Sequence, residues 1–102
     1  GASGQNIYPE EIEDKLNSLA LVAESVVVQK GEKLVGLVYP DFDEAQSLNL
    51  GRKELEDIME QNRHELNTMV PGYSKLSEIR IHDEEFEKTP KKSIKRYLYT
   101  AE

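Results

Sequence analysis

Residues 22–39 read VAESVVVQKGEKLVGLVY and decide the fold, because two apolar runs flank a short polar break. Val22–Gln29 and Leu34–Tyr39 are rich in β-branched and aliphatic residues, a composition typical of strands. Between them, Gly31 can adopt the positive φ that a short hairpin loop requires. Three consecutive valines at 26–28 predict a strand that is buried on both faces. We therefore expect an antiparallel hairpin, ended by the proline that follows it.

The segments on either side of this hairpin carry other regular patterns. A helix is expected over 9–19, with Pro9 at its first position and an apolar face at i, i+4 and i+7. A longer amphipathic helix is expected over 52–70, and a strand with one dry face over 75–82. Thr89-Pro90 has the residue types of a helix start, which predicts a last helix near the end of the chain.

Residues 41–51 are expected to form a loop without a metal. The loop starts Asp41-Phe42-Asp43, as a calcium loop would, but Ala45 and Gln46 stand where a further ligand and a glycine are needed. The order helix, hairpin, helix, strand, helix predicts one α+β domain over residues 1–102. It should contain a small, mainly antiparallel sheet with a hairpin and about three packed helices.

The composition limits what this domain can do. The chain has 102 residues, 37% of them hydrophobic, so it can form one domain with a thin core. Its net charge of −7 argues against a general nucleic-acid binder or an anionic-membrane binder. It has no cysteine for disulfides or thiolate sites, and no apolar run is long enough to span a bilayer. We expect a cytoplasmic protein and leave a peripheral membrane location open.

Basic charge is concentrated at one end of the chain. Residues 88–102 carry five Lys and Arg side chains and one acidic side chain, whereas residues 1–87 carry 8 basic and 19 acidic ones. One interpretation is a solvated helix end whose cations complement the helix dipole. The five side chains are Lys88, Lys91, Lys92, Lys95 and Arg96.

Several motifs together resemble a known family. Residues 4–13 read GQNIYPEEIE and resemble the G-x-N-I-x-P-x-E-I-E segment that opens the C-terminal domain of the adenylate-forming enzymes. The valines at 26–28 with residues 34–40 are similar to that domain's hairpin, and residues 71–74 with residues 79–81 are similar to its next strand. Residues 86–96, FEKTPKKSIKR, resemble the closing P-K-T-x-S-G-K-I-x-R segment, in a form most similar to long-chain fatty acyl-CoA synthetases.

The resemblance implies a larger enzyme with a two-step reaction. A carboxylate attacks the α-phosphate of ATP to give an acyl-adenylate and pyrophosphate, and the thiol of coenzyme A then displaces AMP. A large N-terminal domain, absent from this sequence, would hold ATP, Mg²⁺ and the fatty acid. The small domain would rotate on a hinge and present one face in each step. We expect the 102-residue chain alone to be inactive.

The family resemblance also assigns site residues. Ser3, Gly4 and Gln5 match the segment that lines the pantetheine passage, where a residue without a Cβ permits close approach. Aligning the family's Thr, Ile and Arg with this chain places Ser93 at the position of the catalytic lysine. Serine cannot supply that positive charge.

Three explanations of this departure stay open. Lys92 or Lys95 reaches the site, which we favour, or the enzyme is slow, or adenylation is lost. The basic stretch, with Arg96, is also expected to meet the phosphates of coenzyme A. The alternatives are another acid:CoA ligase or adenylation domain, and a non-catalytic α+β binding module, which the serine favours. A nucleic-acid module is opposed by the net charge.

Overall fold

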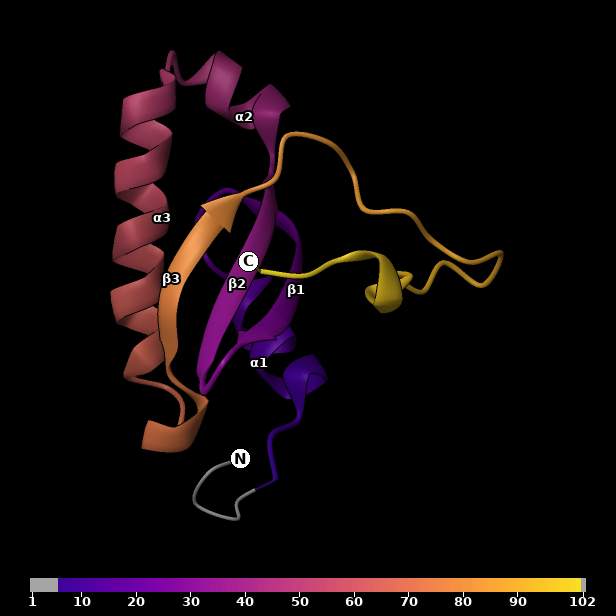
Figure 1. Ribbon diagram of the computed structural model, residues 1–102. Coiled ribbons are helices and arrows are strands. Elements are labelled where there is room, and N and C mark those ends of the chain that lie inside the picture. Colours follow the sequence, from indigo (N-terminus) through magenta and orange to yellow (C-terminus); the bar gives the residue numbers. More distant parts are fainter. Residues whose placement is uncertain (1–5, 102) are drawn as a thin grey trace.

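A computed structural model of the chain describes residues 6–101 and contains one three-stranded sheet of order β1-β2-β3 (Figure 1). Single turns of 3₁₀ helix lie at Gly72–Ser74 and Arg96–Leu98. The regular elements are α1 (Pro9–Leu16), β1 (Val22–Lys30), β2 (Lys33–Pro40), α2 (Phe42–Ser47), α3 (Arg52–Asn67) and β3 (Leu76–Ile81). The predicted α+β class with three helices is confirmed.

The predicted hairpin is confirmed. β1 and β2 are antiparallel, and Val26 and Val27 pair with Leu37 and Gly36. Val26 and Val27 are both buried, although neighbouring side chains of a strand point to opposite faces. The continuous valine run therefore marks a strand that is covered on both sides, as predicted.

The sheet is mixed, which corrects the expectation of a mainly antiparallel one. β3 pairs with β2 in parallel, with Gly36 beside Ile79 and Val38 beside Ile81. A parallel neighbour requires a crossover connection, and α3 provides it between the two strands (Figure 1). The order strand, long helix, strand is the sequence signal of this arrangement.

Helices cover one face of the sheet. α1 packs on β1 and α3 packs on β3, and the two helices also touch each other. The core on this side joins side chains from both helices with those of the strands. Its most buried members are Ile12, Leu16, Val38, Leu55, Met59, Leu66 and Leu76.

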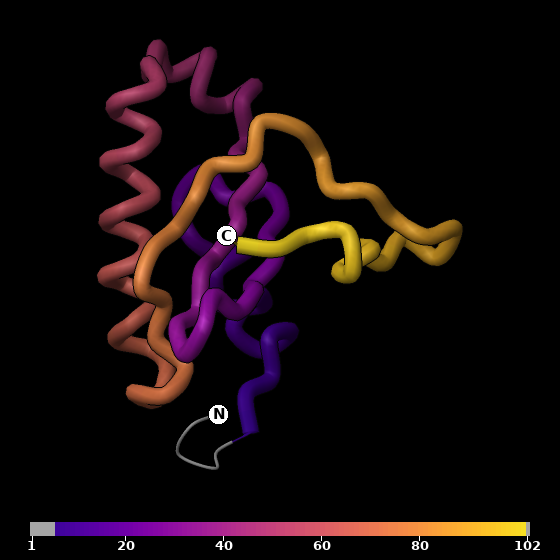
Figure 2. Tube along the Cα trace, viewed as in Figure 1, coloured from indigo at the N-terminus to yellow at the C-terminus, as the bar shows by residue number. Residues whose placement is uncertain are grey.

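The other face is covered by the C-terminal segment, which is not helical. Residues 82–101 leave β3, extend away from the sheet and return across it (Figures 1 and 2). Phe86 and Ala101 are buried against Val26, Val35 and Leu37. The helix expected from Thr89-Pro90 is therefore wrong, since this segment must lie flat enough to place apolar side chains on the sheet.

Two smaller corrections concern the helices. The expected loop 41–51 contains α2, and the Asp41 carboxylate accepts a hydrogen bond from the Glu44 N–H at 3.0 Å as its N-cap. The carboxylate that resembled a calcium ligand thus has a structural partner. α1 and α3 end three residues before the ends predicted for them, at Leu16 and Asn67.

The α3 side chain Asn67 binds the outer edge of β3. Its carboxamide accepts from the Leu76 N–H at 2.9 Å and donates to the Leu76 carbonyl oxygen at 3.0 Å. Arg63 donates to the same carbonyl oxygen at 3.2 Å. α3 is therefore fastened to the edge strand by polar bonds as well as by its apolar face.

Gly36 permits the close approach of α1 and β3 in the core, which gives a first prediction. A Cβ at this position would lie 2.9 Å from Leu76 Cδ1 and 3.3 Å from Leu16 Cδ2, both in buried side chains. Gly36→Ala should lower the free energy of unfolding by about 1–3 kcal/mol, because the packed core must shift. Urea unfolding would measure this.

The matched control is Gly72→Ala, since a Cβ there meets nothing within 4 Å. It should change the stability by less than about 0.5 kcal/mol. An equal effect of the two substitutions would contradict this account of the packing around Gly36.

Candidate functional site

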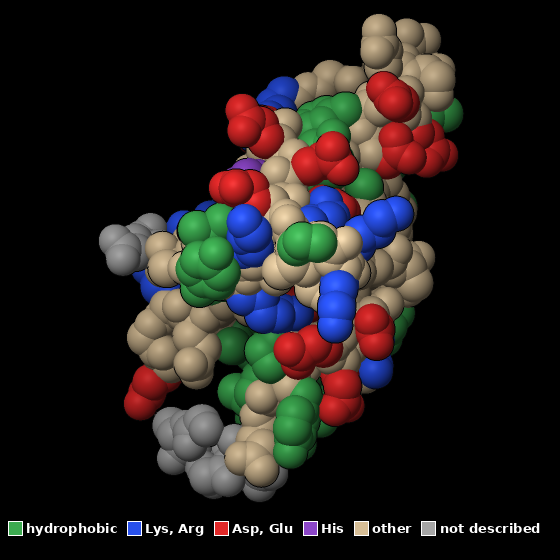
Figure 3. Space-filling view, turned by 90° about the vertical axis from the view of Figure 1, so that its right-hand side faces the viewer, with side chains coloured by type: hydrophobic (Ala, Val, Ile, Leu, Met, Phe, Trp, Pro, Cys, Tyr) green, Lys and Arg blue, Asp and Glu red, His purple; other side chains and the backbone are tan. Residues whose placement is uncertain are grey.

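The basic end of the chain forms a small two-stranded ribbon, here called the basic hairpin (residues 87–95). An antiparallel bridge joins Lys88 and Ile94, and the Lys95 N–H donates to the Glu87 carbonyl oxygen at 2.8 Å. Nearer the tip, the Thr89 N–H donates to the Ser93 carbonyl oxygen at 2.8 Å. Figure 3 shows several Lys and Arg side chains near the centre of this side of the molecule, with acidic side chains around them.

A tight turn closes the basic hairpin. The Lys92 N–H donates to the Thr89 carbonyl oxygen at 2.8 Å, with Pro90 at the second position, which its fixed φ suits. The Thr89 hydroxyl accepts from the Ser93 N–H at 3.3 Å, so this residue caps a turn and not the expected helix. Lys92 has φ of +66°, a left-handed conformation that favours glycine. In the closing motif of the adenylate-forming enzymes, glycine stands at this position.

The ribbon geometry separates the candidate site residues. Ile94 packs against the core under the C-terminal segment. Because successive side chains of an extended strand point to opposite faces, Ser93 and Lys95 share the face that Ile94 does not occupy. Lys92 lies at the turn, outside this alternation. By this alternation Lys95, the residue before the 3₁₀ turn Arg96–Leu98, is the lysine expected on the face of Ser93, the position where the family resemblance expects a lysine.

Lys88 anchors the first leg of the basic hairpin. Its ammonium lies 2.5 Å from a carboxylate oxygen of Glu24 on β1 and donates to the Phe86 carbonyl oxygen at 3.1 Å. The hydrogen bond to Glu24 raises the pKa of Lys88 above its ordinary value. Because its pKa is raised, Lys88 is charged at neutral pH and the bond to Glu24 is present. The stabilisation from this bond is lost only when the pH rises through the pKa of Lys88. Lys88 therefore has a structural role, since it joins the basic hairpin to β1.

Arg96 anchors the second leg. Its two terminal nitrogens donate to the two carboxylate oxygens of Glu13 on α1, the bond from Nη1 being 2.6 Å long. Its Nε lies 3.5 Å from a carboxylate oxygen of Glu10. The bidentate bonding to Glu13 raises the pKa of Arg96 further above its high ordinary value. The prediction that Arg96 binds coenzyme A stays a prediction.

Glu13 is a residue that the sequence reasoning did not single out. Only 6% of it is exposed, and besides Arg96 it accepts from the Val27 N–H at 2.7 Å. In the sheet formed by the described residues 6–101, β1 is an edge strand, and Glu13 bonds this N–H from a helix instead of from a neighbouring strand. The sequence contained one signal for it. Glu13 is the second Glu of the G-x-N-I-x-P-x-E-I-E segment, and it follows the buried Ile12 directly.

The remaining sequence-predicted site residues have no described structure. Ser3, Gly4 and Gln5 lie outside the described residues. Within residues 6–101, no three His, Cys, Asp or Glu side chains are grouped so as to hold a metal ion. No helix in the same range is both long and apolar enough to cross a bilayer.

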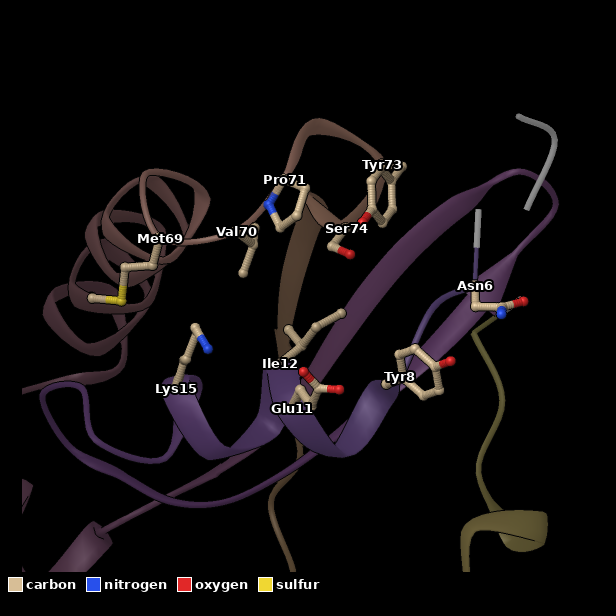
Figure 4. Close-up of a pocket in the computed structure, with 10 residues that line it drawn as sticks. All are labelled: Asn6, Tyr8, Glu11, Ile12, Lys15, Met69, Val70, Pro71, Tyr73 and Ser74. Carbon is tan, nitrogen blue, oxygen red and sulfur yellow. The ribbon is translucent and has the colours of Figure 1, made fainter. Parts of the chain in front are cut away.

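A separate groove lies between α1 and the segment that follows α3 (Figure 4). Its volume is about 250 Å³, and three of its lining side chains are exposed large hydrophobic ones, Tyr8, Met69 and Tyr73. None of Lys92, Ser93 and Lys95 lines it. Asn6 does, and it follows directly in sequence after Ser3-Gly4-Gln5.

Comparison with known proteins identifies the family. The sequence pattern of the family described as AMP-binding enzyme C-terminal domain matches residues 2–102. The chain therefore belongs to this family. A search of curated protein sequences finds no match.

Solved structures share the fold. A benzoate CoA ligase from Burkholderia xenovorans LB400 has 19% identity and a TM-score of 0.68 over 93% of this chain and 18% of its own. An acyl-CoA synthetase of Brucella canis has 24% identity and a TM-score of 0.66 over 94% and 17%. The A-PCP didomain of a carboxylic acid reductase from Segniliparus rugosus has 15% identity and a TM-score of 0.65 over 92% and 14%. This chain thus spans less than a fifth of each of these chains.

The left-handed turn residue gives a second prediction. Lys92→Gly should raise the free energy of unfolding by about 0.5–1 kcal/mol, because glycine adopts positive φ without a steric cost. The control is Lys91→Gly, which removes a neighbouring charge where no positive φ occurs and should be neutral or destabilising. Thermal unfolding would compare them, and a stability loss in Lys92→Gly would contradict the turn assignment.

Proposed function

We propose that this chain is the C-terminal domain of an AMP-forming ligase that joins a carboxylic acid, most specifically a long-chain fatty acid, to coenzyme A. The observation that carries the proposal is the basic hairpin, an ordered two-legged loop with exposed lysines at the place of the family's closing motif. Family membership over nearly the whole chain supports the acid-activating class.

This domain would act together with an N-terminal adenylating domain of the same protein. That domain would hold ATP, Mg²⁺ and the fatty acid, since residues 6–101 group no carboxylates for a metal ion. When the acid attacks the α-phosphate, negative charge develops on the phosphate oxygens. A preorganised ammonium from the basic hairpin would stabilise it, and this is the contribution of the present chain to the first step.

Lys95 is the residue that we propose for this ammonium. Two residues along an extended strand are about 6.6 Å apart, a distance that a lysine side chain spans. Since Lys95 shares the ribbon face of Ser93, its ammonium can reach the space where a lysine at 93 would extend. Lys92, which lies at the turn with a positive φ, is our second candidate.

In the second step, the thiol of coenzyme A would displace AMP from the acyl-adenylate. Ser3, Gly4 and Gln5 are proposed to line the passage for its pantetheine arm, as the family resemblance implies. Lysines of the basic hairpin, with Arg96, are the candidates for its phosphates. The two steps would then use different faces of one small domain.

The lysine assignment gives a third prediction, for the full-length protein. Lys95→Ala should slow ATP–pyrophosphate exchange by about 10²–10³-fold, because a positioned charge is lost where phosphate charge develops. Ser93→Lys should speed the exchange, since it restores a lysine at the family position. Rates of the two half-reactions, measured separately, would test both substitutions.

Lys92→Ala is the matched control and should change the exchange rate by less than about threefold, as a surface charge does. Loss in Lys92→Ala with full activity in Lys95→Ala would reverse the assignment. If neither alanine variant nor Ser93→Lys changes either half-reaction, the non-catalytic binding module that Ser93 favours becomes the better account.

The substrate class gives a fourth prediction. The full-length protein should activate long-chain fatty acids with a higher kcat/KM than short-chain fatty acids, benzoate or malonate, measured by acid-dependent AMP release. The support is the closing segment at 86–96, whose form without Ser-Gly before the lysine position is most similar to long-chain fatty acyl-CoA synthetases. A preference for benzoate would place the protein among the other acid:CoA ligases.

A further inference from the structure

We propose that the Glu13–Arg96 ion pair positions the basic hairpin, and that Glu13 is thus a positioning residue for the adenylation step. The second half of this statement rests on the proposed function. The first half concerns the described residues alone, and the two can be tested separately.

Among the described residues 6–101, the hydrogen bonds of residues 89–93, the tip of the basic hairpin, all run between members of this stretch. Lys91, Lys92 and Ser93 at the tip are exposed. The orientation of the tip must therefore be set at its two legs.

Both legs are fixed to neighbouring parts of the domain. The first is held by Lys88 and Glu24, with side chains 27% and 19% exposed, and Glu24 also accepts from the Phe86 N–H at 3.3 Å. The second leg is held by Arg96, whose partner Glu13 is more buried than Glu24. Arg96 directly follows Lys95, so whatever fixes its guanidinium also limits where the Lys95 backbone can lie.

The Glu13 carboxylate is itself held in one place. Its Oε2 accepts from the Val27 N–H at 2.7 Å and from Arg96 Nη1 at 2.6 Å, and Oε1 accepts from Nη2. A bidentate guanidinium–carboxylate pair fixes orientation as well as distance. The hydrogen bond from the Val27 N–H holds the carboxylate at the edge of β1, and the carboxylate in turn holds Arg96 at the end of the basic hairpin. The Glu13 carboxylate thus links α1, β1 and the residue that follows the basic hairpin.

The first test uses hydrogen exchange on the 102-residue chain. Arg96→Ala should speed exchange of the hydrogen-bonded amides of Thr89, Lys92 and Lys95 by at least about tenfold, while the α3 amides keep their rates. Glu13→Gln should do the same with less loss of global stability, because its amide oxygen still accepts from Val27. Arg52→Ala, which removes an exposed pair with Asp83, is the matched control and should leave these amides unchanged.

Unchanged exchange at these amides in both Arg96→Ala and Glu13→Gln would overturn the positioning role. Equal acceleration at every amide, α3 included, would also overturn it, since that result describes a general loss of stability. Neither readout depends on ligase activity, so the outcome stands apart from the proposed function.

The second test uses the full-length protein. Arg96→Ala should lower kcat of ATP–pyrophosphate exchange by about tenfold or more with little change in KM for ATP, because the cation is misplaced while the nucleotide is held by the other domain. Arg96→Lys should retain only part of the original kcat, because lysine keeps the positive charge but cannot form the bidentate hydrogen bonds. Equal losses in both half-reactions, or a rise in KM alone, would overturn the link to adenylation, and the rise in KM would favour direct phosphate binding by Arg96.

Discussion

The structure depends on one buried carboxylate, that of Glu13. It receives a backbone N–H from β1 and both terminal nitrogens of Arg96, so three parts of the chain meet on its two oxygens. A buried charge is costly unless it is paired and hydrogen-bonded, and here both conditions are met. Without the carboxylate, the Val27 N–H would lose its acceptor, and the guanidinium would keep only the 3.5 Å contact of its Nε with Glu10 of α1.

The segment that carries the candidate chemistry also completes the core. Phe86 and Ala101 are buried on the sheet face opposite the helices, and the basic hairpin lies between them in sequence. Tyr99 packs edge-on to Phe86, with ring centroids 4.9 Å apart, and its hydroxyl accepts from the Glu87 N–H. The hairpin is therefore a loop tied down at both ends by buried aromatic and aliphatic side chains, which suits a group that must meet a ligand in a fixed place.

Local patterns were sufficient for the hairpin and for α3, because a valine run and a long apolar stripe leave few alternatives. They failed at Thr89-Pro90, where the same residue types begin either a helix or a tight turn, and only the distant partners of Ile94 and Arg96 decide between them. The basic site residues followed from a family motif. Glu13 also lies in a family motif, but its role could not be predicted from the sequence, since its partners lie 14 and 83 residues away along the chain.

The two edge strands have a further consequence, for the behaviour of the domain in concentrated solution. An unpaired strand edge is a template on which another chain can add a strand, and this is a route to aggregation. Here side chains occupy backbone groups on both outer strands, Glu13 at Val27 of β1 and Asn67 at Leu76 of β3. These side chains thus occupy one backbone group of β1 and two of β3, which leaves fewer open positions for edge-to-edge growth of the sheet.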